Sequence, residues 1–448
     1  MKRYVLWCSL MWAVSGVVAA DEIKVGFGKV DVTPQKALRL SGYGNRTTVS
    51  EGVEQKLYAR AMVIAVGDQR FVLANADTIG FPASVTAKIA QQLAEKLKVP
   101  RERFVLCSTH SHTAPQLSGG IWNIFSEPMT EEQTRNMDQY TQALADGVVQ
   151  AAQLGVQNLK PAQLTWGETA AAFAVNRRVL KDGAWTGFGV TPEGAVDQAV
   201  PIIKAVDAEG KMLGVVFNYA CHNTTLGPKF NRVCGDWSGY AAAKLEAAHP
   251  GAVAISTIGC GADANPNPRD GLEFAQQHGA ALSQVVDKLL AEKLQPLTTI
   301  PRAMYAEVDL PFDLPARTLL EQRRTSRRVQ EQRHAEYFLS LPELPTHYPC
   351  PVQVWRFPKG PTMIFLGGEV VVDYALRLKR DLAPQPLGVS GYSNDVFAYV
   401  ASERVRREGG YETDFSMIYY RLPGPWAAGT EELLIKRIKE MVGKVNEN

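Results

Sequence analysis

Short runs of apolar residues alternate along this chain with longer segments in which apolar residues recur every three to four positions. Short runs bounded by turn-forming residues are typical of buried strands, and the longer period is typical of amphipathic helices. The runs predict strands at residues 71–76, 104–108, 213–220, 252–258 and 363–366. The periodic segments predict helices at residues 83–97, 131–153, 239–248, 271–290, 370–380 and 430–442.

Strands that alternate with helices predict an α/β protein with a mostly parallel or mixed central sheet flanked by helices. No internal repeat or long Ser/Gly/Pro linker divides the chain, so we expect one large domain over residues 21–448. Residues 116–130, with Trp122 and Phe125, are predicted to form a loop at a pocket mouth or elsewhere on the surface. The arginine-rich residues 317–334 favour a solvated helix over a phosphate site.

Residues 1–20 have the layout of a secretory signal peptide. Lys2 and Arg3 precede an apolar run that ends in the small-residue cleavage site Val18-Ala19-Ala20. The run is shorter than the roughly 20 residues that a membrane span needs, which favours a cleaved signal over an anchor. We therefore expect a secreted or periplasmic protein that begins near Asp21 and has no stable membrane insertion.

Composition and charge limit the classes of partner. The chain is 46% hydrophobic and 21% charged, which is ordinary for a folded soluble protein. Loss of Lys2 and Arg3 with the signal would bring the formal net charge from +2 to zero, so we expect no nucleic-acid partner. Five cysteines would remain, too few for a disulfide scaffold; buried thiols are favoured, and a Cys221–Cys234 bridge stays open.

Polar residues able to bind a metal follow the predicted strands. The ends of strands in an open α/β sheet meet at one crevice, so we expect these residues to form one site. They are Asp77, His110, His112, His222, Asp263, Asn265 and Glu369.

The histidines and Glu369 carry the metal hypothesis. If strand geometry continues through residue 112, His110 and His112 share a face. Glu369 is predicted to open a helix after two glycines, where a carboxylate either meets a ligand or offsets the helix terminus. His, His, Glu and a further oxygen donor suit zinc, which activates a bound water. The other histidines are expected to be packed or surface residues: His249, His278, His334 and His347.

Six motifs, in order, resemble the catalytic N-terminal domain of the neutral, non-lysosomal ceramidase family. They are THSHTAP, NYACHNTT, GDWSGYA, GCGADANP, GGEVVVDYALRLK and AYVASERVRREGGYE. The resemblance runs from about Val25 to Trp426 and implies the fold of that domain, a zinc cofactor and a small-molecule or lipid substrate.

The resemblance also implies roles for single residues. His110, His222, Glu369 and Tyr399 look like the zinc ligands, and His112 like the histidine that shuttles protons or binds substrate. Tyr411 resembles a tyrosine that steadies the substrate oxyanion. Arg177 resembles a substrate-contacting arginine, with Arg178 as the neighbouring alternative.

Two departures bear on the activity. Asn265 stands where family members carry a serine in GDVSPN, so nucleophilic catalysis from this position is lost while its amide can still donate to an oxyanion. After YYRLPGPWAAG the sequence shows one amphipathic segment, so we expect the catalytic domain without the family's C-terminal Ig-like sandwich domain.

These observations predict an exported, zinc-dependent, ceramidase-like hydrolase of an amide (N-acyl) bond that uses zinc-activated water. One alternative keeps the zinc site but acts on a glycan-derived or N-acyl sugar substrate. A second alternative is a binding relative that has lost catalysis.

Overall fold

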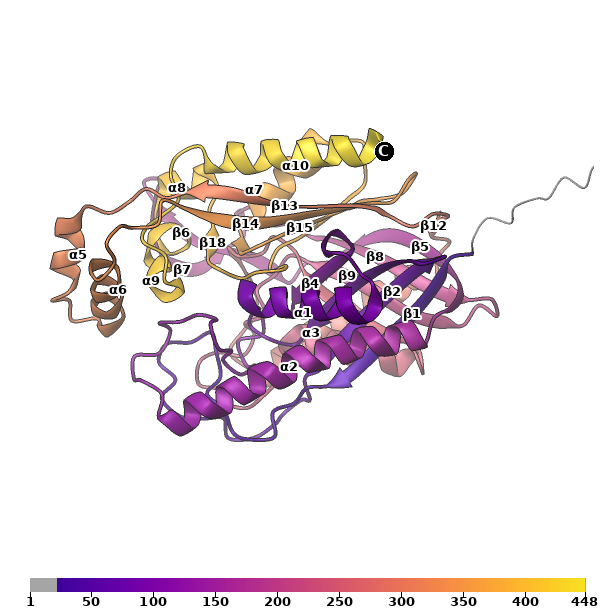
Figure 1. Cartoon of the computed structure of the whole chain (residues 1–448), viewed down its shortest axis with the longest axis horizontal. Coiled ribbons are helices and arrows are strands. Elements are labelled where there is room, and N and C mark those ends of the chain that lie inside the picture. The colour runs from indigo at the N-terminus through magenta and orange to yellow at the C-terminus, as the bar shows by residue number, and fades with distance from the viewer. Residues whose placement is uncertain (1–21, 448) are drawn as a thin grey trace, which may run out of the picture.

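The computed structural model of this chain describes residues 22–447. The predicted signal peptide at residues 1–20 lies outside the described residues. Within them the chain forms an α/β structure in which one large mixed sheet and a smaller sheet are flanked by helices (Figure 1).

The large sheet has the strand order β10-β9-β8-β5-β1-β2-β3-β4, and the short strand β12 pairs with β5. Its strands β3 and β4 are parallel, as are β9 and β10, and the pairs between them are antiparallel. Of the two predicted alternatives, a mostly parallel or a mixed sheet, the mixed sheet is confirmed. The strands are β1 (Lys24–Asp31), β2 (Tyr58–Val66), β3 (Gln69–Ala76), β4 (Phe104–Ser108), β5 (Lys160–Ala170), β8 (Ala199–Asp207), β9 (Met212–Tyr219), β10 (Val253–Ile258) and β12 (Gln295–Leu297).

The large sheet folds over so that its two halves pack face to face. Met62 and Leu73 share one buried cluster with Val216 and Ile255 from the other half. The Asn75 amide donates to the Ser256 carbonyl at 2.6 Å, which ties β3 to β10. This packing brings the carboxyl ends of the parallel strands β4, β9 and β10 to one place.

Helices cover the outer faces of both halves (Figure 1). Their apolar sides pack on alternate strand residues, as expected for amphipathic helices on a sheet. Helices α1 (Ala83–Leu97) and α2 (Glu131–Gln157) cover β2 and β3, and helices α3 (Asp236–Ala248) and α4 (Leu272–Leu290) cover β9 and β10.

A second sheet, of order β13-β14-β15-β17, packs one face on the large sheet and the other on helices. Figure 1 shows α10 and α7 lying across its outer side. Two isolated β-bridges join the end of β17 and the residues after it to the ends of β4 and β10. They pair Cys107 with Ser393 and Gly259 with Ser390. The elements are β13 (Arg302–Pro311), β14 (His347–Arg356), β15 (Thr362–Leu366), β17 (Leu387–Ser390), α7 (Val372–Asp381) and α10 (Thr430–Glu447).

The predicted elements appear within a few residues of their expected bounds, with two corrections. Glu369 does not open a helix: it lies in strand β16 (Glu369–Val370), parallel to β18 (Tyr399–Val400), and α7 begins only at Val372. The Glu369 N–H donates to the Ala398 carbonyl at 2.7 Å, and this pairing is why the backbone stays extended. The arginine-rich segment forms two short helices, α5 (Arg317–Arg323) and α6 (Val329–Leu339), where one was predicted.

Two further expectations can be compared with the fold. Residues 116–130 form an irregular loop, in which Phe125 is buried and Trp122 is 40% exposed. The cysteines of the described chain are free buried thiols, so Cys221 and Cys234 are not bridged.

Among the helices of residues 22–447, none is both long enough and apolar enough to cross a bilayer.

A buried carboxyl near helix α1 predicts a pH-dependent stability. Burial raises the pKa of Asp395 to about 7, although Tyr348 donates to it at 2.7 Å. The unfolded chain releases this proton near pH 3.8 while the native state retains it, so stability falls as the pH rises through the native pKa. We expect the free energy of unfolding, measured with urea, to fall between about pH 5 and about pH 8. The fall should be smaller for Asp395→Asn than for the wild type. Equal losses in the two proteins would contradict this assignment.

Candidate metal centre

His110 and His112 lie just after β4, but strand geometry does not carry them there. The strand ends at Ser108, and His110 adopts a left-handed backbone conformation with φ of 53°. The expected strand alternation is therefore wrong, because the left-handed turn at His110 interrupts the extended backbone. The turn still brings the two rings together, with 3.1 Å between their Nε2 atoms.

His222 joins this pair from the end of β9. Its Nε2 lies 3.2 Å from the Nε2 of His110, although 112 positions separate the residues. One nitrogen from each of the three rings lies within 4.8 Å of the others, and all three residues are buried. The cluster can hold a metal ion.

Glu369 completes the cluster from β16. Its Oε2 lies 3.1 Å from His110 Nε2 and 3.3 Å from His222 Nε2, and the residue is 1% exposed. The carboxylate therefore points at the same two nitrogens.

Backbone carbonyls fix the tautomers of both imidazoles. His110 Nδ1 lies 2.6 Å from the Ile79 carbonyl, and His222 Nδ1 lies 3.2 Å from that of Gly261. A carbonyl only accepts, so each Nδ1 carries the hydrogen and each Nε2 presents a lone pair. Burial lowers the pKa of His222 to about 3, which keeps the ring neutral.

The resulting arrangement fits a cation. Two imidazole lone pairs and Glu369 Oε2, which has no conventional hydrogen-bond donor among the described residues, face one another in a buried space. Acceptors held this closely repel one another unless a positive ion lies among them. Nitrogen and carboxylate donors of this kind suit zinc.

Tyr399 reaches the same place because β18 pairs with β16. Its register partner is Glu369, and its hydroxyl lies 3.4 Å from His222 Nε2. The ring is nearly parallel to that of His222, with an interplanar angle of 7°. The structure thus brings together the four residues predicted as ligands.

Arg177, and not Arg178, faces this cluster. Its Nη2 donates to the Tyr399 hydroxyl at 3.2 Å, and its Nε donates to Glu412 at 2.9 Å. The Arg178 guanidinium instead donates to Glu408 and to the other carboxylate oxygen of Glu412. One buried carboxylate therefore neutralises two buried arginines and fixes the direction of Arg177.

Asn265 and Tyr411 border the same space. Asn265 Oδ1 accepts from Arg177 Nη1 at 3.4 Å and from the Thr224 hydroxyl at 3.3 Å. A guanidinium cannot accept, so the oxygen must face it and Nδ2 remains as a donor. The Tyr411 ring packs at 5.4 Å from that of Tyr399.

The remaining predicted polar residues lie outside the cluster. Asp77 binds Arg60 at 3.0 Å, and Asp263 accepts from the Val372 N–H at 2.9 Å, so both have structural partners. The other histidines also have partners elsewhere. His249 binds Asp287, His278 and His334 bind backbone carbonyls, and His347 lies near Asp309.

Sequence reasoning missed two tyrosines. Tyr420, in α9 (Met417–Tyr420), donates its hydroxyl to Glu369 Oε1, which leaves Oε2 facing the histidines. Tyr392 packs on the His110 ring at 4.4 Å. Their only sequence signal is a tyrosine in the segments GYSND and IYYR, which a buried core tyrosine would also give.

The nitrogen and oxygen donors buried at the end of the folded-over α/β sheet define a protein with a candidate metal site. The family described as neutral/alkaline non-lysosomal ceramidase, N-terminal, matches residues 23–267, more than half of the chain. The chain belongs to this family. The matched range contains His110, His112, Arg177, His222 and Asn265.

Known relatives agree with this membership. The neutral ceramidase of Pseudomonas aeruginosa is 27% identical over 249 residues, which are 53% of this chain and 35% of that protein. The neutral ceramidase of Mycobacterium tuberculosis is 25% identical over 290 residues, 61% of this chain and 42% of that protein. The aligned part thus spans less than half the length of these curated relatives.

Solved structures extend the similarity beyond the matched range. A crystal structure of the Pseudomonas aeruginosa neutral ceramidase superposes with a TM-score of 0.72 at 17% identity, over 94% of this chain and 74% of that one. A ceramidase complexed with C2 gives 0.73 at 17%, over 95% and 76%. At this identity the similarity establishes the fold, and the prediction of a ceramidase-like fold is confirmed.

We expect the hydrogen bond from the Tyr420 hydroxyl to Glu369 to raise the affinity of the centre for a metal ion. Loss of a hydrogen bond to a ligating carboxylate typically weakens metal binding 10- to 100-fold, so Tyr420→Phe should lower zinc affinity by about this factor. Chelator competition with the purified protein measures it without any substrate. Tyr419→Phe is the matched control, because that hydroxyl contacts Arg328 and not Glu369. Equal zinc affinities in the two variants would contradict the role of Tyr420.

Proposed function

We propose that this protein is a zinc-dependent hydrolase of amide (N-acyl) bonds. The observation that carries the proposal is the convergence of acceptor atoms from His110, His222 and Glu369 in one buried space. Membership of the neutral/alkaline ceramidase family supports it.

Four residues would hold the zinc ion: His110, His222, Glu369 and Tyr399. Bound there, zinc would polarise the substrate carbonyl and activate water for its hydrolysis. Carbonyl contacts to both Nδ1 atoms and the Tyr420 hydroxyl orient the ligands before any metal arrives. Such preorganisation favours binding because little side-chain freedom remains to be lost.

His112 would move a proton in the proposed reaction. Its Nε2 faces His110, while its buried Nδ1 has no hydrogen-bond partner among residues 22–447. Gly42 makes the room for this nitrogen, since a Cβ at residue 42 would lie 2.3 Å from it. His112 would pass a proton to the amine that leaves the substrate.

Arg177, Asn265 and Tyr411 would orient the substrate and stabilise negative charge on its carbonyl oxygen. Arg177 supplies a fixed positive charge and Asn265 a free amide donor beside it. An asparagine cannot form an acyl intermediate as a serine can, so water would attack the carbonyl directly.

The proposal also covers the substrate and the export of the protein. Ceramide or a related N-acyl lipid is the proposed substrate, because the curated relatives are neutral ceramidases. We also propose export through cleavage of residues 1–20, with residues 21–448 as the catalytic domain.

His110→Ala should abolish both metal binding and turnover, because it removes the residue that contacts His112, His222 and Glu369 together. Zinc per chain is measured by elemental analysis, and fatty acid release is followed from an N-acyl sphingoid lipid and an N-acyl sugar. His249→Ala, remote from the centre, should retain both zinc and activity. Undiminished activity in metal-free His110→Ala protein would exclude the mechanism. Zinc binding without release of any product would favour the binding-relative alternative.

Asn265→Ala tests the oxyanion contact separately from the metal. Removal of one preorganised donor typically lowers kcat by about 10²- to 10³-fold, and zinc content should stay unchanged because Asn265 binds Arg177 and Thr224 and no proposed ligand. Steady-state kinetics and elemental analysis of the same preparations measure both. An unchanged kcat would show that Asn265 does not contact the reacting carbonyl.

A further inference from the structure

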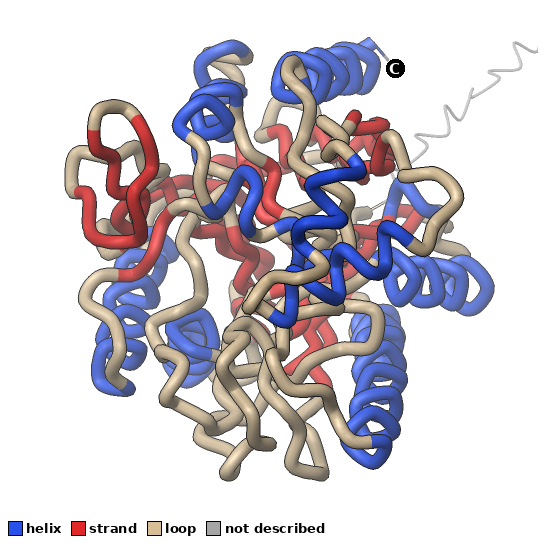
Figure 2. The backbone as a smooth tube through the Cα atoms, turned by 90° about the vertical axis from the view of Figure 1, so that its left-hand side faces the viewer, coloured by secondary structure: helices blue, strands red, loops and turns tan. Residues whose placement is uncertain are grey.

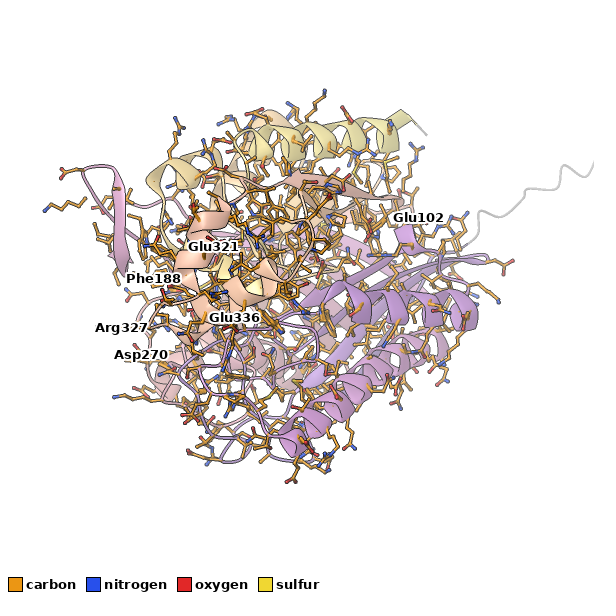
Figure 3. The ribbon with its side chains drawn as sticks, turned by 60° about the vertical axis from the view of Figure 1, so that its left-hand side comes forward. Glu102, Phe188, Asp270, Glu321, Arg327 and Glu336 are labelled. Atoms are coloured by element: carbon orange, nitrogen blue, oxygen red, sulfur yellow. The ribbon has the colours of Figure 1, made fainter. Side chains whose placement is uncertain are left out.

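Tyr392 lies beside the candidate metal centre, in the loop that follows β17. The residue is 1% exposed and shares a buried cluster with Ile258 and Val396. Figure 2 views the molecule from the side that carries α9, where loops (tan) form much of the chain, and Figure 3 labels Phe188 on this side. Phe188 is 51% exposed and its ring lies 4.8 Å from the Arg177 guanidinium, so Arg177 borders an exposed side chain. Tyr392 is instead enclosed by the protein and can act only through the residues that it contacts.

The Tyr392 side chain contacts both of the proposed histidine ligands. Its ring lies 4.4 Å from the His110 ring, at an interplanar angle of 35°. Its hydroxyl oxygen lies 3.4 Å from His222 Nδ1. Because the contact of this nitrogen with the Gly261 carbonyl requires a hydrogen on it, the tyrosine oxygen is a second acceptor for the same N–H. One side chain therefore packs on the first ring and accepts from the second.

The backbone of Tyr392 is bonded to the segments that carry His110 and Glu369. Its N–H donates at 2.9 Å to the carbonyl of Gly368, the residue before Glu369. Its carbonyl accepts from the Ser108 N–H and from the Ser108 hydroxyl, both at 3.2 Å, two positions before His110. Tyr392 has a left-handed φ of 51°, which a bulky residue rarely adopts. Such a conformation persists where the surrounding structure maintains it, as these bonds do.

We propose that Tyr392 is a positioning residue that fixes the His110 and His222 rings for metal binding, an inference that rests on the proposed function. A hydrogen bond at Nδ1 fixes one edge of an imidazole and still allows the ring to tilt. The Tyr392 ring restricts that tilt for His110 by packing, and its oxygen restricts it for His222. Contacts of this kind set the tautomer and orientation of metal-binding histidines.

Chelator competition for zinc tests the proposal without any substrate. Loss of a contact to a metal ligand typically weakens metal binding 10- to 100-fold. Tyr392→Phe removes only the hydroxyl and should weaken zinc binding about ten-fold. Tyr392→Leu also removes the ring and should weaken it about 100-fold. Equal zinc affinities in the wild type and both variants would overturn the proposal.

Tyr374→Phe and Tyr374→Leu are the matched controls. Tyr374 is also fully buried, and its hydroxyl donates to the Ala401 carbonyl at 3.2 Å. The leucine variants at the two positions remove the same amount of buried ring and should destabilise the fold alike. The Tyr374 variants should nevertheless bind zinc as tightly as the wild type. A loss of zinc affinity in them as large as in the Tyr392 variants would show a general effect of packing and would also overturn the proposal.

A metal-free measurement separates this inference from the proposed function. Nitrogen NMR of the histidine rings in the apoprotein shows which ring nitrogen carries the hydrogen, and His222→Ala identifies the signals of His222. In the wild type His222 should carry it at Nδ1, and in Tyr392→Phe the other tautomer should appear because that N–H has lost an acceptor. If the wild type binds no zinc, the proposed function fails, and the His222 tautomer still decides the inference. An unchanged tautomer in both Tyr392 variants would then overturn it.

Discussion

The structure depends on one electrostatic constraint: acceptor atoms from distant segments face one another in a space closed to water. His110 and His222 each use Nδ1 on a backbone carbonyl, so their Nε2 lone pairs point inward toward Glu369 Oε2. A buried cluster of this kind is unfavourable by itself, because desolvated acceptors have lost their water and gained no donor. A bound cation would remove that cost.

The scaffold brings these atoms together by closing the large sheet over itself. The ends of β4 and β9 carry the histidines, and the segment after β17 contacts both β4 and β10 through single bridges. The short parallel pair β16 and β18 then places Glu369 beside Tyr399. The local backbone at these points is specialised: His110 is left-handed, and Gly368 before Glu369 has φ of 81°. Such conformations concentrate at functional sites, where the surrounding structure maintains them.

A second set of contacts governs the charged groups around the centre. Glu412 lies between Arg177 and Arg178, and Arg177 continues to Tyr399 and Asn265. A buried pair of arginines requires such a carboxylate, because an unpaired buried charge costs several kcal/mol. The network also holds Asn265 in place. Its oxygen is occupied by Arg177 and Thr224, which leaves a donor and no nucleophile at this position.

The sequence by itself predicted the long helices and five of the strands, but not β1, β5 and β8, and it singled out three of the four proposed ligands. Strand β4 and helix α1 have the predicted bounds, and His110, His112 and His222 were singled out because each follows a strand. Glu369 was singled out in the same way, although the helix expected there was wrong, and Tyr399 was inferred only through a family motif. Only the tertiary structure decided the β16–β18 pairing, the tautomers, the contact of Tyr420 with Glu369 and the contacts of Tyr392 with both histidines. The physical reason is that periodicity records local burial, whereas these features depend on contacts between segments far apart in the chain, as with the 112 positions between His110 and His222.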